Sequence, residues 1–191
     1  SGIHFIDSGD YHYITKLMTD FIYEPFDLVL IDHHTDMQSS IVGDMLSCGN
    51  WAKKALQNPF LHRLYLIGPS KHDLKSVERN KVLSFSIEEL DQGATIPLET
   101  KYPVYISIDK DVLDERYAMT NWNQGDMSLG MLEDVLAHFL KNCEVIGIDI
   151  CGDDPDIDDY PTYIKAERIN NLSDDALYQT AMKILKRRQK K

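Results

Sequence analysis

Six short aliphatic runs recur along this chain of 191 residues, and segments with helical spacing of apolar residues separate several of them. Strands that are apolar on both faces are typical of a parallel sheet covered by helices on each side. We therefore predict a three-layer α/β/α fold with a mainly parallel sheet, built as a single domain over residues 1–191. The predicted strands cover residues 3–7, 26–32, 63–68, 82–87, 103–109 and 144–150, and the predicted helices cover residues 13–23, 51–56, 129–140 and 172–185.

The composition narrows the class of protein. A formal net charge of −11 at pH 7 argues against a nucleic-acid binder, and the basic run 183–191 is typical of the end of a helix. No apolar segment approaches the roughly 20 residues that span a bilayer, and no signal-peptide pattern is visible at the start. Three cysteines without a CxxC pair favour a reduced, cytoplasmic setting. We expect a small-molecule substrate, with neither nucleic acid nor membrane as a partner.

Acidic residues close three of the six predicted strands: Asp32, Asp109 and Asp149. The first predicted strand leads into a segment that carries Asp10 and His12. Ligands of open parallel α/β sheets bind at the carboxyl ends of the strands, so these side chains are expected to gather at one edge of the sheet. The pattern favours a functional site over independent exits of the chain to the surface.

The spacing of the acids and histidines indicates a metal site. An extended chain points every second side chain to one side, and both the segment 32–36 and the segment 109–111 place their candidates at this step. Converging carboxylates raise one another's pKa unless cations neutralise them. Four carboxylates and two imidazoles exceed the needs of one tetrahedral zinc ion and suit two harder ions, with manganese expected. The set consists of His12, Asp32, His34, Asp36, Asp109 and Asp111.

Three motifs resemble those of the ureohydrolases, a family that includes arginase, agmatinase and formimidoylglutamase. "SGDYHY" (8–13), "DHHTD" (32–36) and "SIDKDVLDE" (107–115) are similar to the family's GGDHS, DAHxD and SxDxDxxDP motifs, in the same order. "GIDICGDDP" (147–155) is similar to its later DxxExxP strand. The resemblance implies an arginase/deacetylase-like fold and a divergent arginase-like protein that lacks the family's N-terminal segment. It also raises the possibility of a homo-oligomer.

The resemblance implies how the candidate ligands share two metal ions. The ligands would be, for one ion, His12, Asp32, Asp36 and Asp109 and, for the other, Asp32, His34, Asp109 and Asp111. Asp32 and Asp109 would then bridge the two ions. A hydroxide between the ions, rather than a side chain, would attack the substrate, because two cations lower the pKa of bound water and polarise the carbon under attack.

Several departures from the family pattern fall on positions that bind the substrate. Two others lie in the metal motifs, where Tyr11 is an extra residue before His12 and Glu115 replaces a Pro. Gly152 stands where the family has a Glu that grips a guanidinium group, and Ala52 stands where arginases carry a proton-shuttling His. The segment 120–128 replaces a GTGTP-like stretch. These differences imply an intact metal site beside an altered substrate pocket. The candidate substrate-binding residues are Asn50, Trp122, Asn123 and Asp153.

We therefore predict a binuclear-metal-dependent hydrolase of a carbon–nitrogen bond in an amidine, guanidine or amide substrate other than arginine. A deacetylase-like amidohydrolase is one alternative, although deacetylases generally lack the acids that Asp36 and Asp111 supply. The other alternative is a catalytically retired metal-binding or regulatory protein, since both the gripping Glu and the shuttling His are missing.

Each candidate also has a simpler interpretation. The acids of the two metal motifs could be solvated strand ends, but two motifs in register favour metal ligation. His33 replaces a family Ala and is expected to point away from the metals, while Asp149 either supports the site or bonds a turn. The acidic run 153–159 lacks the spacing of an EF-hand, so a solvated loop is expected there.

Overall fold

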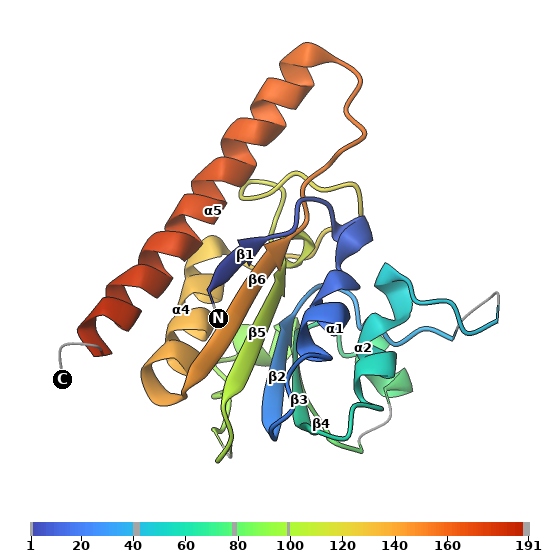
Figure 1. Ribbon diagram of the computed structural model, residues 1–191. Coiled ribbons are helices and arrows are strands. Elements are labelled where there is room, and N and C mark those ends of the chain that lie inside the picture. Colours follow the sequence, from blue (N-terminus) through green and yellow to red (C-terminus); the bar gives the residue numbers. More distant parts are fainter. Residues whose placement is uncertain (1, 40–42, 78–79, 99, 189–191) are drawn as a thin grey trace.

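Helices cover both faces of a six-stranded parallel sheet in this computed structural model, which describes residues 2–39, 43–77, 80–98 and 100–188 (Figure 1). The strand order is β1-β6-β5-β2-β3-β4, and every neighbouring pair is parallel. The predicted parallel sheet is confirmed. The strands are β1 (Ile3–Phe5), β2 (Phe26–Ile31), β3 (Leu61–Gly68), β4 (Val82–Ser86), β5 (Val104–Asp109) and β6 (Val145–Cys151).

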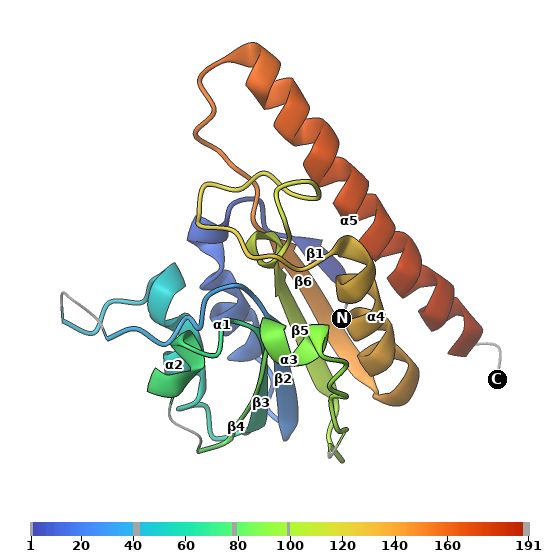
Figure 2. The same ribbon diagram turned by 180° about the vertical axis from the view of Figure 1, so that it is seen from behind.

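Two hydrophobic cores separate the three layers of the fold. The helices α1 (Ile14–Thr19) and α2 (Trp51–Ala55) pack on one face of the sheet, and Leu28 and Leu30 of β2 point towards them. The helices α3 (Ile87–Asp91), α4 (Leu129–Asn142) and α5 (Tyr160–Arg188) cover the other face, as the two opposite views show (Figures 1 and 2). The three-layer prediction is therefore confirmed. Among the described helices, none combines the length and apolar character needed to cross a bilayer.

Two helices differ from the prediction for identifiable reasons. The last helix begins at Tyr160 rather than at residue 172, because its first half buries small or polar side chains, such as Ala166 and Asn170, that give no apolar pattern. The short helix α3 was not predicted. The Ser86 side chain accepts a hydrogen bond from the backbone N–H of Glu89, and Glu89 bonds back to the N–H of Ser86, so this capping box ends β4 and starts α3.

The register of β5 and β6 decides which side chains meet at the carboxyl end of the sheet. Ser107 pairs with Asp149, and Asp109 pairs with Cys151. Alternate residues of a strand share a face, so these four side chains lie on the face covered by α1 and α2. Asp149 lies inside β6, which continues to Cys151, so the expectation that Asp149 closes its strand was wrong.

Candidate metal centre

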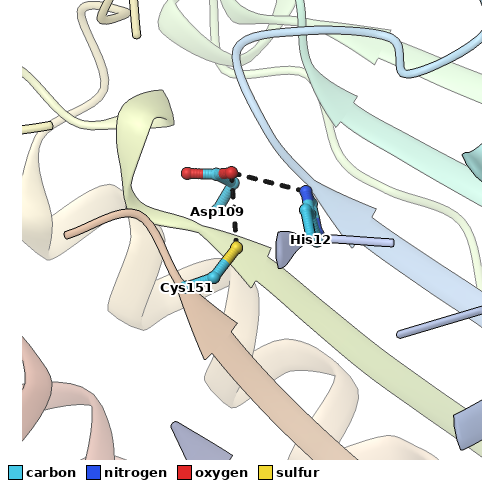
Figure 3. A group of neighbouring side chains, drawn as sticks. All are labelled: His12, Asp109 and Cys151. Carbon is cyan, nitrogen blue, oxygen red and sulfur yellow. Dashed lines mark hydrogen bonds and ion pairs between the residues drawn. The ribbon is translucent and has the colours of Figure 1, made fainter. Parts of the chain in front are cut away.

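His12 lies at the base of the site, at the end of a short 3-10 helix, η1 (Gly9–Tyr11). The Ser8 side chain accepts a hydrogen bond from the backbone N–H of Asp10 and starts this turn, which brings His12 over the ends of β5 and β6. The ring is buried, and its Nε2 atom lies 2.8 Å from Ser107 Oγ. The opposite ring nitrogen, Nδ1, faces Asp109 (Figure 3).

The Nδ1 atom of His12 faces three carboxylates at once. It lies 3.3 Å from Asp32 Oδ2, 3.2 Å from Asp36 Oδ2 and 3.4 Å from Asp109 Oδ2. It forms no hydrogen bond with any residue that the structure describes, and only a protonated ring would make ion pairs with the three carboxylates. A buried polar atom without a hydrogen bond costs free energy, whereas a divalent cation among these four atoms would satisfy all of them. The residues present therefore fit a metal ion.

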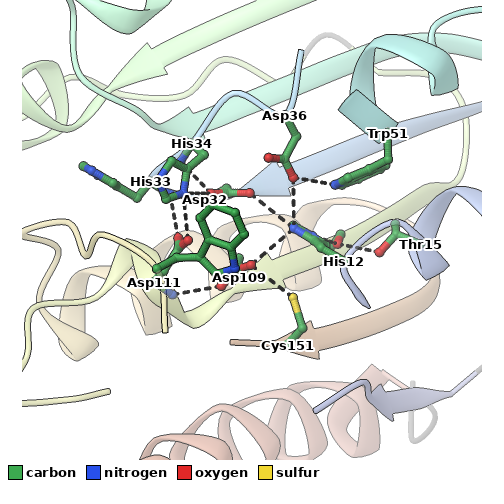
Figure 4. A network of polar contacts seen from close by, with 12 residues as sticks. His12, Thr15, Asp32, His33, His34, Asp36, Trp51, Asp109, Asp111 and Cys151 are labelled. Atoms are coloured by element: carbon green, nitrogen blue, oxygen red, sulfur yellow. Dashed lines mark hydrogen bonds and ion pairs between the residues drawn. The ribbon is translucent and has the colours of Figure 1, made fainter. Parts of the chain in front are cut away.

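A second group of ligand atoms lies next to the first. The Nδ1 atom of His34 lies 2.8 Å from Asp111 Oδ2 and 3.6 Å from Asp32 Oδ1. Asp32 thus presents one oxygen to each group. The ligand atoms of His12, Asp32 and Asp36 lie within 4.8 Å of one another, and so do those of Asp32, His34 and Asp111. Figure 4 shows the network, with the side chain of His33 turned away from it, as expected. A shared carboxylate between two groups is the arrangement that two cations need.

The six residues converge because of turns, not because of strand alternation. β2 ends at Ile31, and Asp36 lies in the following loop with a φ of +50°, in the left-handed region. Asp109 ends β5, and Asp111 lies in the 3-10 helix η4 (Lys110–Val112). The Oδ1 atom of Asp109 accepts a hydrogen bond of 3.0 Å from the backbone N–H of Asp111 and thereby holds this turn. The convergence of the six residues was predicted, but its predicted cause, alternation of side chains along an extended chain, was wrong.

The crowding of acids shifts their protonation. Burial, together with the charge of Asp32, raises the pKa of Asp36 to about 7. Burial and the charges of Asp109 and Asp32 raise the pKa of Asp111 well above its usual range. Burial opposes a charge on His34, but hydrogen bonds and charge from Asp111 and Asp32 prevail and raise its pKa to about 11. Without a cation, the site therefore holds protons that a metal ion would displace.

Several residues outside the candidate ligand set hold the ligands in place. Asp149 Oδ1 accepts hydrogen bonds from Ser107 Oγ at 2.6 Å and from Thr15 Oγ1 at 3.0 Å, and Ser107 in turn contacts His12. The indole N–H of Trp51 donates to Asp36 Oδ2 at 2.5 Å. Ser107 was detectable in principle, because it stands two residues before Asp109 and shares its face. Asp149 has the supporting position that was one of its two predicted roles.

A cavity of about 200 Å³ opens over these groups. Trp122 forms part of its wall, and the indole N–H of Trp122 donates a hydrogen bond of 2.9 Å to Asp10 Oδ1. A larger and mainly apolar cavity of about 670 Å³ lies at the amino ends of β2, β5 and β6, far from the acids. The residues that line the smaller cavity are Gly9, Asp32, His34, Asp36, Gln38, Ser47, Cys48, Gly49, Asp109, Asp111 and Trp122.

Three of the four predicted substrate-binding residues lie outside the set that lines this cavity. Asn50 is buried, and its amide bonds the backbone of Met45 and Ser47. Asn123 is exposed, and among the residues that the structure describes it does not line the cavity. Asp153 lies 2.6 Å from the ammonium group of Lys110. Only Trp122 has the predicted position.

The backbone at Gly152 leaves no room for a side chain. Its φ is +108°, and a Cβ atom would lie 2.6 Å from Asp109 Oδ1 and 2.8 Å from the backbone nitrogen of Lys110. A side chain at this position would therefore displace a candidate metal ligand. The sequence indicates the departure from the family pattern at position 152 but not the contact that excludes a side chain there.

Comparison with known proteins places this fold and site in a family. The sequence matches the profile of the Arginase family over residues 2–171, so the chain belongs to this family and the predicted resemblance to ureohydrolases is confirmed. An uncharacterised protein of Thermotoga maritima is 32% identical over 169 residues, which are 88% of this chain and 65% of that protein.

Solved structures share the fold at lower identity. Formimidoylglutamase from Bacillus subtilis matches with a TM-score of 0.73 and 17% identity, over 95% of this chain and 60% of that one. A triple mutant of a T. brucei arginase-like protein bound with Mn²⁺ matches with a TM-score of 0.66 and 22% identity, over 96% of this chain and 60% of that one. The chain spans less than two thirds of the length of these relatives.

Proposed function

We propose that this protein hydrolyses a carbon–nitrogen bond in a small amidine, guanidine or amide, with two divalent cations as cofactors. Manganese is the expected metal, because hard oxygen ligands outnumber the imidazoles. The same ion is bound by the T. brucei arginase-like variant that shares this fold. The residues that hold the cations in this proposal are His12, Asp32, His34, Asp36, Asp109 and Asp111.

One observation carries the proposal: the buried Nδ1 atom of His12 faces three carboxylate oxygens and makes no hydrogen bond with the described residues. A structural histidine in a core bonds through both nitrogens or exposes one of them to water. Here the second nitrogen is held by Ser107, so the ring cannot turn Nδ1 elsewhere without losing that bond. The atom is fixed in the orientation that a metal ligand requires.

Two bound cations lower the pKa of a coordinated water and polarise the carbon that it attacks. The protein contributes a fixed set of ligands and a small cavity that limits access by water. Asp36 cannot swing away, because Trp51 donates a short hydrogen bond to it. Trp122 covers one side of the cavity and leaves room for a small head group. The excess of carboxylates favours a cationic head group such as an amidinium or guanidinium.

Arginine is not the substrate in this proposal. A guanidinium group in the family pattern is held by a Glu at the position of Gly152, where this backbone leaves no room for a side chain. The neighbouring Asp153 does not replace it, because Lys110 binds its carboxylate. A lost charge-assisted hydrogen bond costs about 1.5–3 kcal/mol, and the substrate also loses its alignment.

A retired metal-binding protein is the second candidate, favoured by Ala52. This residue is fully buried in α2 and stands where arginases carry the shuttling His, so no group at this position can move a proton. Such a protein would keep the metal site and lose turnover.

Metal analysis and an activity panel together test both candidates. The chain is purified with manganese and without chelators, its metal content is measured, and release of ammonia or urea is followed with formiminoglutamate, agmatine, arginine and simple amides. Two ions per chain with turnover of a compound other than arginine support the hydrolase. Two ions without any turnover support the retired protein. A chain that binds no divalent metal, or that hydrolyses arginine at rates usual for the family, contradicts the proposal.

A further inference from the structure

Cys151 lies against the candidate metal centre although no metal motif includes it. It is the last residue of β6, it is 1% exposed, and the strand register places it beside Asp109. Its Sγ atom lies 3.3 Å from Asp109 Oδ2. The ligand atoms of His12, Asp109 and Cys151 all lie within 4.8 Å of one another, and the thiol faces the same carboxylate as His12 (Figure 3).

The surroundings of this thiol are not those of a cysteine that fills an apolar core. A buried structural cysteine packs among aliphatic side chains and stays inert. Cys151 instead contacts the Oδ2 atom of Asp109, which also lies 3.4 Å from His12 Nδ1. That nitrogen is buried and makes no hydrogen bond with the described residues. The thiol and the imidazole nitrogen therefore face the same carboxylate oxygen.

We propose that Cys151 is a further metal ligand on the His12 side of the centre, and that this side prefers a softer ion than manganese. The inference rests on the proposed function, because it takes His12 and Asp109 as ligands. On binding, the thiol loses its proton to solvent and its sulfur bonds the metal as a thiolate. Thiolate ligands select zinc, cobalt or ferrous iron, whereas the His34 side, with carboxylates and one imidazole, suits manganese. The two positions then differ in metal preference.

Cobalt titration of the metal-free protein tests this assignment, because Co²⁺ reports its ligands in its spectrum. A thiolate bound to Co²⁺ adds a charge-transfer band in the near ultraviolet, separate from the visible bands that any protein ligand set produces. We expect this band in the wild type and in the control variant Cys143→Ser. Cys143 is a buried thiol that ends α4 and precedes β6, so it lies at the opposite end of that strand from Cys151. We expect the loss of this band in Cys151→Ser.

Cys48 needs its own variant, because it is half-buried and lines the cavity. If the band survives in Cys151→Ser and disappears in Cys48→Ser, the proposal is overturned and the sulfur ligand is Cys48. Visible cobalt bands without the near-ultraviolet band overturn the role of Cys151 and leave the six-residue site intact. No cobalt bands at all contradict the proposed function itself.

X-ray absorption provides a measurement that does not depend on the folding of Cys151→Ser. The sample is Cys48→Ser loaded with one equivalent of zinc, which leaves Cys151 as the thiol beside the candidate ligands His12 and Asp109. A sulfur neighbour at about 2.3 Å from zinc is expected. A coordination sphere of nitrogen and oxygen alone overturns the proposal.

Discussion

Lys110 stands between two candidate metal ligands in the sequence, and its Nζ atom lies 2.9 Å from Asp174 of α5 on the other face of the sheet. A second carboxylate, Asp153, lies 2.6 Å from the same ammonium group, which is 1% exposed. The buried ammonium group of Lys110 therefore connects the segment that carries Asp109 and Asp111 to α5 and to the loop after β6.

Lys110→Met should destabilise the protein strongly. Removal of one partner from a buried ion pair leaves the others without compensation, which costs about 3–5 kcal/mol. Urea unfolding followed by circular dichroism measures the change. The triple variant Lys110→Met, Asp153→Asn, Asp174→Asn should recover much of the loss, because no charge is then left unpaired. If Lys110→Met alone is as stable as the wild type, the ion pairs of Lys110 with Asp153 and Asp174 contribute nothing to stability.

Gly152→Ala should destabilise the protein by about 1–3 kcal/mol, because a φ of +108° is strained for any residue with a Cβ atom. The new methyl group also meets Asp109 Oδ1, so stabilisation by manganese should weaken. Gly130→Ala in α4 is the matched control, because a Cβ atom there meets no atom within 4 Å. This change should raise the free energy of unfolding by about 0.5–1 kcal/mol. Equal stability of the two variants in thermal melts would contradict the contact described at Gly152.

Asp109→Asn should abolish most of the thermal stabilisation by manganese. The change keeps the shape but removes a negative charge between two cations, so the second ion is lost first. At a metal concentration of about 100 times Kd, the wild type gains about 2.7 kcal/mol, and the variant should gain much less. Asp156→Asn, in the exposed acidic loop, is the control and should melt as the wild type does. The proposed ligand set is wrong if Asp109→Asn keeps the full manganese shift.

Manganese affinity should rise with pH between about 6 and 8, because protons compete with the metal for the same atoms. The pKa of Asp36 is raised to about 7 and that of His34 to about 11, so both groups hold a proton at low pH and release it when the metal binds. The affinity should change by up to about tenfold per pH unit for each proton released. Calorimetry in buffers of different ionisation enthalpy counts the protons. Identical heats in all buffers would contradict this linkage.

The sequence contained enough to predict the parallel sheet and to group the six candidate ligands. Apart from Asp27, the buried strand 26–31 is apolar on both faces. The carboxyl ends of parallel strands meet at one edge of the sheet, so residues that follow the strands are brought together. The two-residue spacing of the candidate ligands was a less reliable guide to how they reach the site. The loop after β2 reaches the site through the left-handed backbone of Asp36, which no periodicity indicates.

The surroundings of Cys151, Lys110 and Gly152 were decided only by the tertiary structure. Each depends on a neighbour far along the chain: Cys151 on the register with Asp109, Lys110 on Asp174 in α5, and Gly152 on the space beside Asp109. By itself, the sequence determined the layers and the edge where the acids gather, because the apolar pattern of each segment and the alternation of strands with helices can be read along the chain. The tertiary structure decided which further side chains contact the six candidate ligands at that edge, because register, helix docking and available space depend on contacts between segments distant in the sequence.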